Sequence, residues 1–99
     1  MKNLSSLDRV IHEPARLTLM ALLSSVKSAD FLFLLKESEL TKGNLSVHLT
    51  RLEEAGYVVA EKTFRGKIPH TEYRLTPKGK SAFDQYRKNL GLIFNAEKE

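Results

Sequence analysis

The chain contains no cysteine, and this absence excludes several kinds of site at once. Without thiols it has no disulfide, no thiolate metal ligand and no cysteine nucleophile. No apolar run approaches the roughly 18 residues that a membrane-spanning helix requires. The stretch from Met1 to Asp8 lacks the long apolar core of a signal peptide. We therefore expect a cytoplasmic location and no membrane association.

The motifs that mark the main enzyme classes are also missing. There is no glycine-rich phosphate loop and no constellation of histidine with carboxylates. His12, His48 and His70 form no spaced cluster, so each is expected to be a surface or half-buried polar side chain rather than a metal ligand. We predict that the protein is not an enzyme and needs no metal or cofactor.

Length and charge favour one domain with a basic segment. The 99 residues, 41% of them apolar, suffice for a single modest core, so we predict one domain over 1–99. Residues 1–40 hold five Lys/Arg and five Asp/Glu, and residues 81–99 hold three of each. Residues 41–80 hold eight Lys/Arg against four Asp/Glu, which is the whole excess of the +4 net charge. A net charge of +4 is ordinary for a small protein, but its localisation favours a polyanion-binding surface.

The most informative stretch runs from Thr41 to Gly56 and has the marks of one helix. Thr41 can cap the first turn with its hydroxyl, and Gly56 can adopt the left-handed conformation that ends a helix. Leu45, Leu49 and Leu52 recur at spacings of four and three, which places them on one stripe facing a core.

The opposite face of this helix is short, polar and free of carboxylates. A face that meets only solvent would more often mix Glu with Lys, whereas a DNA groove favours such side chains. A solvated helix face remains the alternative interpretation. The candidate DNA-binding residues on this helix are Thr41, Lys42, Asn44, Ser46, Val47, Thr50 and Arg51.

Three further helical segments are predicted before Thr41. Residues 1–12 have the spacing of a short amphipathic helix, an N-terminal arm. A second helix begins at Pro14, and its apolar residues cover most of its circumference, so it is the expected central helix. Asp30 is a candidate cap for a third helix over 31–37.

After Gly56 the apolar residues no longer recur at helical spacing but tend to occupy every second position, as in a strand. Residues 57–64 and 70–76 are predicted strands, rich in β-branched and aromatic residues. The turn between them contains Arg65 and Lys67. We expect a β-hairpin with a basic tip.

The last helix is predicted to begin at Thr76 as cap and Pro77 as first helical residue. Its apolar residues form a seam with heptad-like spacing, which favours a dimer interface, with the N-terminal arm packed beside it. The alternative is that this helix packs onto its own domain. The candidate interface residues are Leu4, Leu7, Phe83, Tyr86, Leu90, Ile93 and Phe94.

The order of these elements resembles the winged helix-turn-helix fold. The stretches Lys42–Val59 and Tyr73–Gly79 are similar to those of small MarR- and ArsR-like transcriptional regulators. This resemblance implies an α+β, mostly helical fold with a two-stranded wing and an extended C-terminal helix. It places the winged-helix core at 14–80 and a dimerisation helix at 81–97, with no room for a separate effector domain.

The resemblance also implies a function, namely sequence-specific binding of double-stranded DNA by a homodimeric transcriptional regulator. The recognition helix, 41–55, would enter the major groove, and the wing, 62–72, would contact the flanking minor groove or backbone. Two-fold symmetry of the protein would match a palindromic operator. The alternative is a winged helix that serves as a protein–protein interaction module of the transcription machinery.

Individual roles follow from side-chain chemistry. Asn44 suits adenine, Arg51 suits guanine or a phosphate, and Val47 suits a thymine methyl. Ser46 and Thr50 are short enough to contact bases or backbone.

The basic residues outside that group are assigned to the DNA backbone. Lys42 is expected near a phosphate, and Arg16 is a further phosphate candidate. Arg65 and Lys67 are placed to reach the minor groove or its phosphates.

Overall fold

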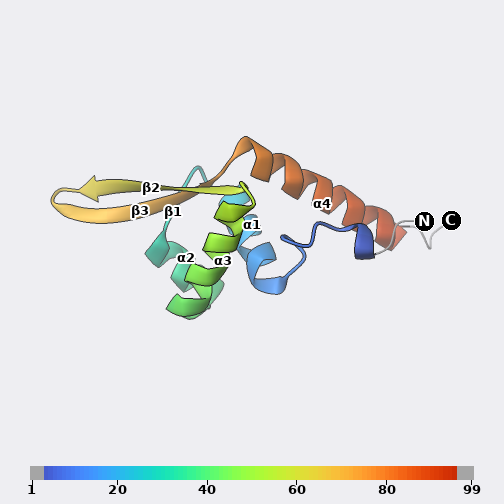
Figure 1. Cartoon of the computed structure of the whole chain (residues 1–99), viewed down its shortest axis with the longest axis horizontal. Coiled ribbons are helices and arrows are strands. Elements are labelled where there is room, and N and C mark those ends of the chain that lie inside the picture. The colour runs from blue at the N-terminus through green and yellow to red at the C-terminus, as the bar shows by residue number, and fades with distance from the viewer. Residues whose placement is uncertain (1–3, 96–99) are drawn as a thin grey trace.

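The computed structural model describes residues 4–95, which form helices and strands in the predicted order (Figure 1). The wing hairpin projects from one end of the helical body, and the last helix extends toward the other. This arrangement confirms the winged-helix prediction. The elements are η1 Leu4–Ser6, α1 Pro14–Ser24, β1 Ala29–Asp30, α2 Phe31–Ser38, α3 Lys42–Glu54, β2 Val58–Arg65, β3 Ile68–Leu75 and α4 Pro77–Asn95.

The helices begin where the sequence places their caps. Asp30 Oδ1 accepts a hydrogen bond of 2.8 Å from the backbone N–H of Phe33, and Thr41 Oγ1 accepts one of 3.2 Å from that of Asn44. Pro14 is the first residue of α1. Each cap satisfies a backbone donor that has no partner within the first turn, so these starts are encoded locally.

The connection between α2 and α3 is as short as predicted. Glu39 ends α2 in the left-handed conformation, with φ 59°, the one positive φ of a non-glycine residue in the described part of the chain. Leu40 follows and packs against the core. This turn sets α2 and α3 as a helix-turn-helix pair.

The wing is a regular antiparallel hairpin. Its ladder runs from Val58 opposite Leu75 to Arg65 opposite Ile68. Gly66 has φ 65° and opens the two-residue turn, the pattern of a type II′ turn.

A third strand extends the sheet at the base of the wing. Ala29 of β1 pairs with Tyr73 of β3, which gives the strand order β1-β3-β2. Besides the two wing strands, the sequence indicates only a short extended piece over residues 26–29, which overlaps β1 at Ala29, because a two-residue strand has no apolar period to detect.

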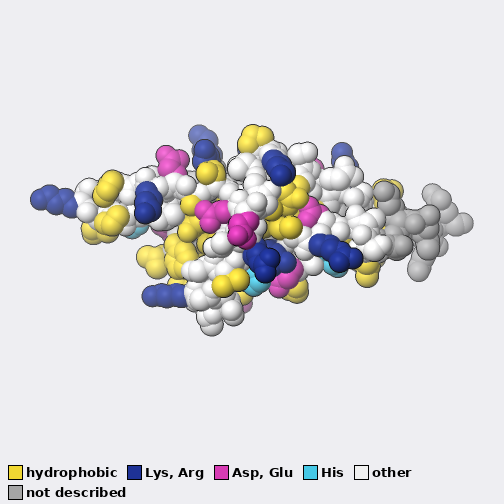
Figure 2. Space-filling view, viewed as in Figure 1, with side chains coloured by type: hydrophobic (Ala, Val, Ile, Leu, Met, Phe, Trp, Pro, Cys, Tyr) yellow, Lys and Arg dark blue, Asp and Glu magenta, His cyan; other side chains and the backbone are white. Residues whose placement is uncertain are grey.

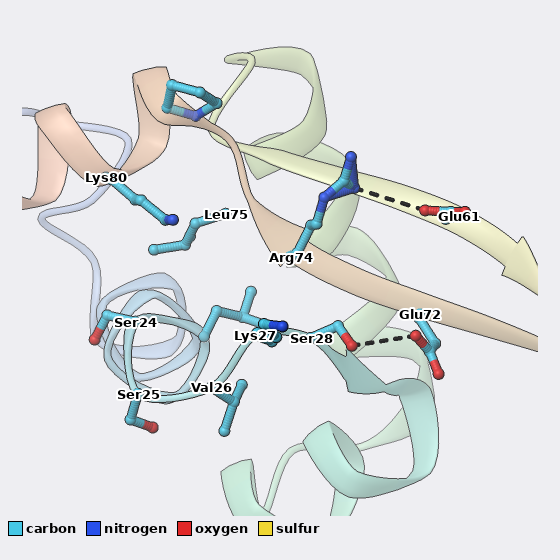
Figure 3. Close-up of a pocket in the computed structure, with 12 residues that line it drawn as sticks. Ser24, Ser25, Val26, Lys27, Ser28, Glu61, Glu72, Arg74, Leu75 and Lys80 are labelled. Carbon is cyan, nitrogen blue, oxygen red and sulfur yellow. Dashed lines mark hydrogen bonds and ion pairs between the residues drawn. The ribbon is translucent and has the colours of Figure 1, made fainter.

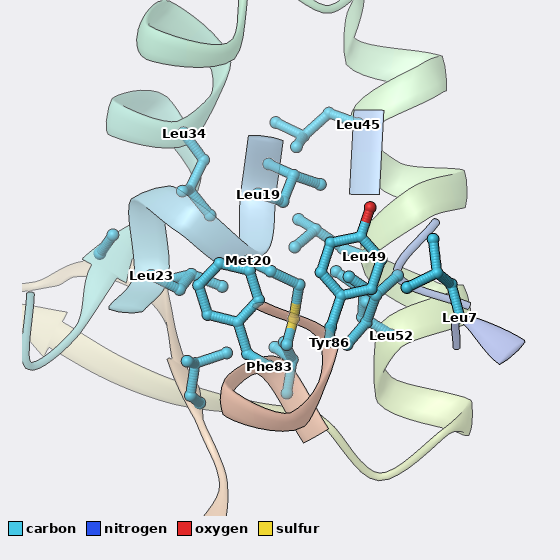
Figure 4. Close-up of a cluster of buried hydrophobic side chains, with 14 residues drawn as sticks. Leu7, Leu19, Met20, Leu23, Leu34, Leu45, Leu49, Leu52, Phe83 and Tyr86 are labelled. Atoms are coloured by element: carbon cyan, nitrogen blue, oxygen red, sulfur yellow. The ribbon is translucent and has the colours of Figure 1, made fainter. Parts of the chain in front are cut away.

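One apolar core joins α1, α2, α3, the base of the wing and the first half of α4 (Figure 4). Leu45, Leu49 and Leu52 are at most 1% exposed, which confirms the predicted core stripe of α3. Within residues 4–95, no helix has the length and apolar composition needed to cross a membrane. The buried set is Leu7, Ile11, Leu19, Met20, Leu23, Ala29, Leu34, Leu45, Leu49, Leu52, Val58, Leu75, Phe83 and Tyr86.

The prediction of a helix over 1–12 is wrong for the described part of that segment. Only the single 3-10 turn η1 forms, and residues 1–3 lie outside the described residues. Asp8 Oδ1 accepts hydrogen bonds from the backbone N–H groups of Val10 (2.8 Å) and Ile11 (3.3 Å), which competes with helix formation. The apolar pattern instead marks burial, since Leu7 and Ile11 are at most 3% exposed.

The last helix is continuous across the boundary predicted at residue 81. Phe83 and Tyr86 are 7% and 2% exposed within the chain itself, so this half of α4 belongs to the core. These two residues and Leu7 are therefore corrected from interface to core positions, because the N-terminal segment and α1 leave a partner no access to them. Residues 96 and 97 of the predicted dimerisation helix lie outside the described residues.

Two glycines in α4 give a matched stability prediction. A Cβ at Gly79 would lie 2.1 Å from the carbonyl oxygen of Tyr57, whereas a Cβ at Gly91 would meet nothing within 4 Å. We expect Gly79→Ala to lower the free energy of unfolding by about 2 kcal/mol or more through overpacking. Gly91→Ala should raise it by about 1 kcal/mol through helix propensity. Urea unfolding followed by circular dichroism measures both; equal effects would contradict the close approach of α4 to Tyr57.

Candidate nucleic-acid interface

The outward face of α3 is fully available to a ligand. Every residue predicted there is exposed, and Val47 is 56% exposed although it is apolar. Gly43, Val47 and Thr50 follow one another at spacings of four and three on the side away from the core. The structure thus brings together one exposed recognition surface, formed by Thr41, Lys42, Asn44, Ser46, Val47, Thr50 and Arg51.

The C-terminal end of α3 is closed by a glycine motif. Gly56 has φ 80°, as predicted, and its N–H donates to the carbonyl of Glu53 at 2.9 Å. The N–H of Tyr57 donates to the carbonyl of Leu52 at 3.0 Å. These two bonds form a Schellman motif, which turns the chain directly from α3 into β2.

The end of the wing hairpin is hydrogen-bonded to this glycine motif. Thr76 Oγ1 donates to the carbonyl of Gly56 at 2.6 Å and accepts from the N–H of Gly79 at 2.9 Å. The backbone N–H of Thr76 donates to the carbonyl of Tyr57 at 3.0 Å. We call Gly56, Tyr57, Thr76 and Gly79 the wing junction. It joins the end of α3, both ends of the hairpin and the start of α4, so it sets the angle between recognition surface and wing.

Tyr57 connects this junction to the N-terminal segment. Its hydroxyl donates to Asp8 Oδ2, and Lys78 Nζ lies 5.8 Å from the centre of its ring. Burial of the ring, with the hydrogen bond and the negative charge of Asp8 adding to it, raises the pKa of Tyr57 from 10.0 to about 12. The folded chain therefore favours the neutral, donating phenol.

Three arginines line a hollow beside α3. It has a volume of about 360 Å³ and brings Arg9 close to Arg16 and Arg51, with Glu54 at its edge. Arg9 is exposed and was not predicted, because its position depends on the N-terminal segment folding back over α3. Three arginines and one glutamate among the residues that line this hollow give it a net positive charge, which suits an oxyanion such as a phosphate.

Arg16 has a structural role in addition to its predicted one. Its Nε donates to the carbonyl of Val10 at 2.5 Å, and its Nη1 lies 3.2 Å from Nδ1 of His48. His48 is half-buried, 3.8 Å from Oε1 of Glu13. Arg16 thus fastens the N-terminal segment to α1 and α3, so two of its three guanidinium nitrogens already have partners.

The remaining histidines do not form a ligand set. His12 Nδ1 lies 2.9 Å from the hydroxyl of Tyr86, and His70 is half-buried in the wing. In the part of the chain that the structure describes, no group of three His, Cys, Asp or Glu could hold a metal ion.

The wing carries its basic residues at the end away from the body, where Figure 2 shows Lys and Arg side chains interspersed with apolar ones. Lys67 is exposed at the turn. Arg65 lies 3.3 Å from Asp30 Oδ2, so it points toward the start of α2. Because the Arg65 side chain is 61% exposed, this ion pair is weak and can exchange for a phosphate.

A second hollow lies away from α3, between the α1–β1 loop, the base of the wing and the start of α4 (Figure 3). Its volume is about 700 Å³. Arg74 lies 3.8 Å from Glu61, and Ser28 donates to Glu72 at 3.1 Å; Lys27 and Lys80 also line the hollow. No residue of the recognition surface contributes to it.

The chain matches the family model described as winged helix DNA-binding domain over residues 15–93. It is also 34% identical over 79 residues to an uncharacterized protein of Methanocaldococcus jannaschii, which covers 79% of this chain and 85% of that protein.

Solved structures of transcriptional regulators have the same fold. A transcriptional regulator homologue from Pyrococcus horikoshii superimposes with a TM-score of 0.84 at 27% identity, over 90% of this chain and 88% of that one. A protein described as a MarR-family transcriptional regulator from Enterococcus faecalis gives a TM-score of 0.74 at 25% identity, over 97% and 96% of the two chains.

The Tyr57–Asp8 bond predicts a pH dependence of stability. Below pH 10 the phenol is protonated in both states, so its contribution is complete; between pH 10 and about 12 the unfolded chain loses the proton first, and the contribution falls. We expect Tyr57→Phe to cost about 1–2 kcal/mol of unfolding free energy at pH 8 and less at pH 11. Urea unfolding of both proteins at each pH tests this. Burial also raises the pKa values of Tyr73 and Tyr86, but both residues are present in both proteins. If the difference in unfolding free energy between wild type and Tyr57→Phe is the same at pH 8 and pH 11, the assignment is contradicted.

Proposed function

The chain belongs to the family of winged helix DNA-binding domains, and from this premise we propose that it binds double-stranded DNA sequence-specifically as a homodimeric regulator of transcription in the cytoplasm. The observation that carries the proposal is the recognition surface, whose seven residues are all exposed and neutral or basic, on a helix anchored by three buried leucines. The first carboxylate on this face is Glu54, one turn beyond Thr50 at the C-terminal end of the helix. A helix whose N-terminal part exposes only neutral and basic side chains at this place in a winged helix is suited to the major groove.

The base contacts are assigned to the N-terminal part of α3. Asn44 would pair with adenine through its amide, and the exposed side chain of Val47 would meet a thymine methyl. Ser46 and Thr50 would contact bases or backbone. Lys42, next to the cap residue Thr41, would contact a phosphate beside the groove.

The backbone contacts come from three elements. Lys67 would reach the flanking minor groove or its phosphates, and Arg65 would join it by exchanging Asp30 for a phosphate. The hollow between Arg9, Arg16 and Arg51 would hold a phosphate on the other side of α3. Because Arg51 lines this hollow, we expect it to contact a phosphate rather than a guanine base.

The proposed dimer uses the distal half of α4 and the residues beside it. Leu4 and Phe94 are 58% and 69% exposed, and Leu90 and Ile93 are half-buried. Leu92, which the sequence pattern did not single out, is 53% exposed on the same helix. This end of α4 extends past the helical body (Figure 1). Leu90 and Ile93 pack partly against the core, whereas Leu92 and Phe94 remain exposed among the described residues. Two copies joined there would present two recognition helices to a palindromic operator.

Two variants separate base contacts from backbone contacts. We expect Asn44→Ala to lower affinity for the preferred sequence about tenfold or more while changing little for other sequences. Lys67→Ala should weaken binding to all sequences alike and reduce the slope of log affinity against log salt by about one per subunit. Fluorescence anisotropy over a salt series, on DNA selected from a random pool, measures both.

The matched control is Lys27→Ala, which removes an exposed cation of the α1–β1 loop, away from the recognition surface, the wing tip and the proposed dimer interface. If the wild-type protein binds no DNA even at low salt, the DNA-binding proposal is wrong and the protein-interaction module replaces it. If Asn44→Ala and Lys67→Ala have equal, sequence-blind effects, the recognition helix is assigned wrongly.

The proposed dimer is tested by measuring the mass of the protein in solution by sedimentation. We expect the wild-type protein to sediment as a dimer at micromolar concentration and Phe94→Glu to sediment as a monomer, because a charge would be buried in an apolar interface. Gln85→Glu makes the same change of charge at an exposed position of the same helix and should leave the dimer intact. A monomeric wild-type protein, alone and on operator DNA, would refute the interface.

A further inference from the structure

The end of the wing exposes apolar side chains on both faces. Phe64 is 72% exposed and Ile68 is 64% exposed. The ladder pairs Phe64 with Pro69 and Arg65 with Ile68. Directly paired residues of an antiparallel hairpin share a face, so the Phe64–Pro69 pair lies on one face and Ile68 on the other. A hairpin that meets only water carries mainly polar residues on its free faces, whereas this one exposes a large apolar side chain on each face near its end.

The same segment is basic and narrow. Residues 62–70 include Lys62, Arg65 and Lys67 and no carboxylate. The turn has only two residues, because Gly66 adopts a φ of 65°. The hairpin also extends well beyond α2 and α3 (Figure 1), so nothing in its own domain covers its end. Positive charge, small width and apolar side chains together are complementary to the DNA minor groove, which is negative, about 6 Å wide and walled by sugars.

We propose, on the basis of the DNA-binding function above, that Phe64 is a wedge which the wing inserts at a base step of the flanking minor groove. Ile68, on the other face, packs against the sugar wall, while Lys67 holds a phosphate. An apolar wedge partly unstacks a base step and bends the duplex. Pyrimidine–purine steps unstack most easily, so the flank of the operator is selected for such a step without a hydrogen bond to any base.

The competing occupant is a protein. Leu32 and Phe33 at the start of α2 are 63% and 41% exposed, and a protein partner could cover them together with the wing. The charge of the wing favours DNA. Residues 62–70 include three Lys or Arg and no carboxylate, whereas the centre of a protein–protein interface is depleted of charged residues.

The experiment measures affinity and bend angle together, by fluorescence energy transfer between the ends of a selected DNA duplex. We expect Phe64→Ser to lower affinity about tenfold, to reduce the bend, and to leave the salt slope unchanged. Phe64→Leu, which keeps an apolar wedge, should retain both affinity and bend. Lys67→Ala should behave oppositely to Phe64→Ser, with a smaller salt slope and a retained bend. The wild type, unlike Phe64→Ser, should prefer a flank with a TA or CA step severalfold over one without.

The outcomes separate the two proposals. If the wild type binds and bends DNA but Phe64→Ser does so equally well, the wedge is refuted and the DNA-binding function stands. If the wild type binds no DNA, both proposals fail. Because Phe64 is exposed at the end of the hairpin, a thermal melt that matches the wild type confirms that any loss arises from the contact and not from unfolding.

Discussion

The geometry of this protein depends on the wing junction, where α3 ends, the hairpin closes and α4 begins. Gly56 turns the chain out of α3, and the Thr76 hydroxyl ties that turn to the start of α4. Gly79 is needed because any side chain would collide with the Tyr57 carbonyl. Since each hydrogen bond among these four residues involves a backbone group, the angle between the helix and the wing is fixed independently of the surface residues that would contact DNA.

Because α3 and the wing are held in this way, they can carry exposed residues that do not stabilise the fold. An exposed Val47 on α3 and an exposed Phe64 on the wing contribute little to folding. Both project from elements that are held elsewhere, α3 by its buried leucines and the wing by its junction. This separation explains how a recognition surface of neutral and basic residues and an apolar, basic wing tip can coexist with a buried apolar core.

Much of the fold and the exposed face of α3 could be predicted because their signals are local. Thr41 and Asp30 cap helices through bonds to residues three positions away, and the leucine spacing of α3 identifies its buried stripe. The N-terminal arm was wrong for the opposite reason: Asp8 diverts the backbone into a turn, a competition that apolar spacing does not report. Arg9 was missed because its neighbours Arg16 and Arg51 come from other elements.

The amino-acid sequence by itself determined the order of the elements, the limits of α3, the basic hairpin and the family. It could not determine which apolar residues of α4 face the chain's own core, because heptad spacing is the same for a core and for a dimer seam. Only the tertiary structure decided that Phe83 and Tyr86 are internal and that Leu92 and Phe94 of the distal part of α4 are exposed. The physical reason is that burial depends on which distant segments, here Leu7 and Ile11, fold back against the helix.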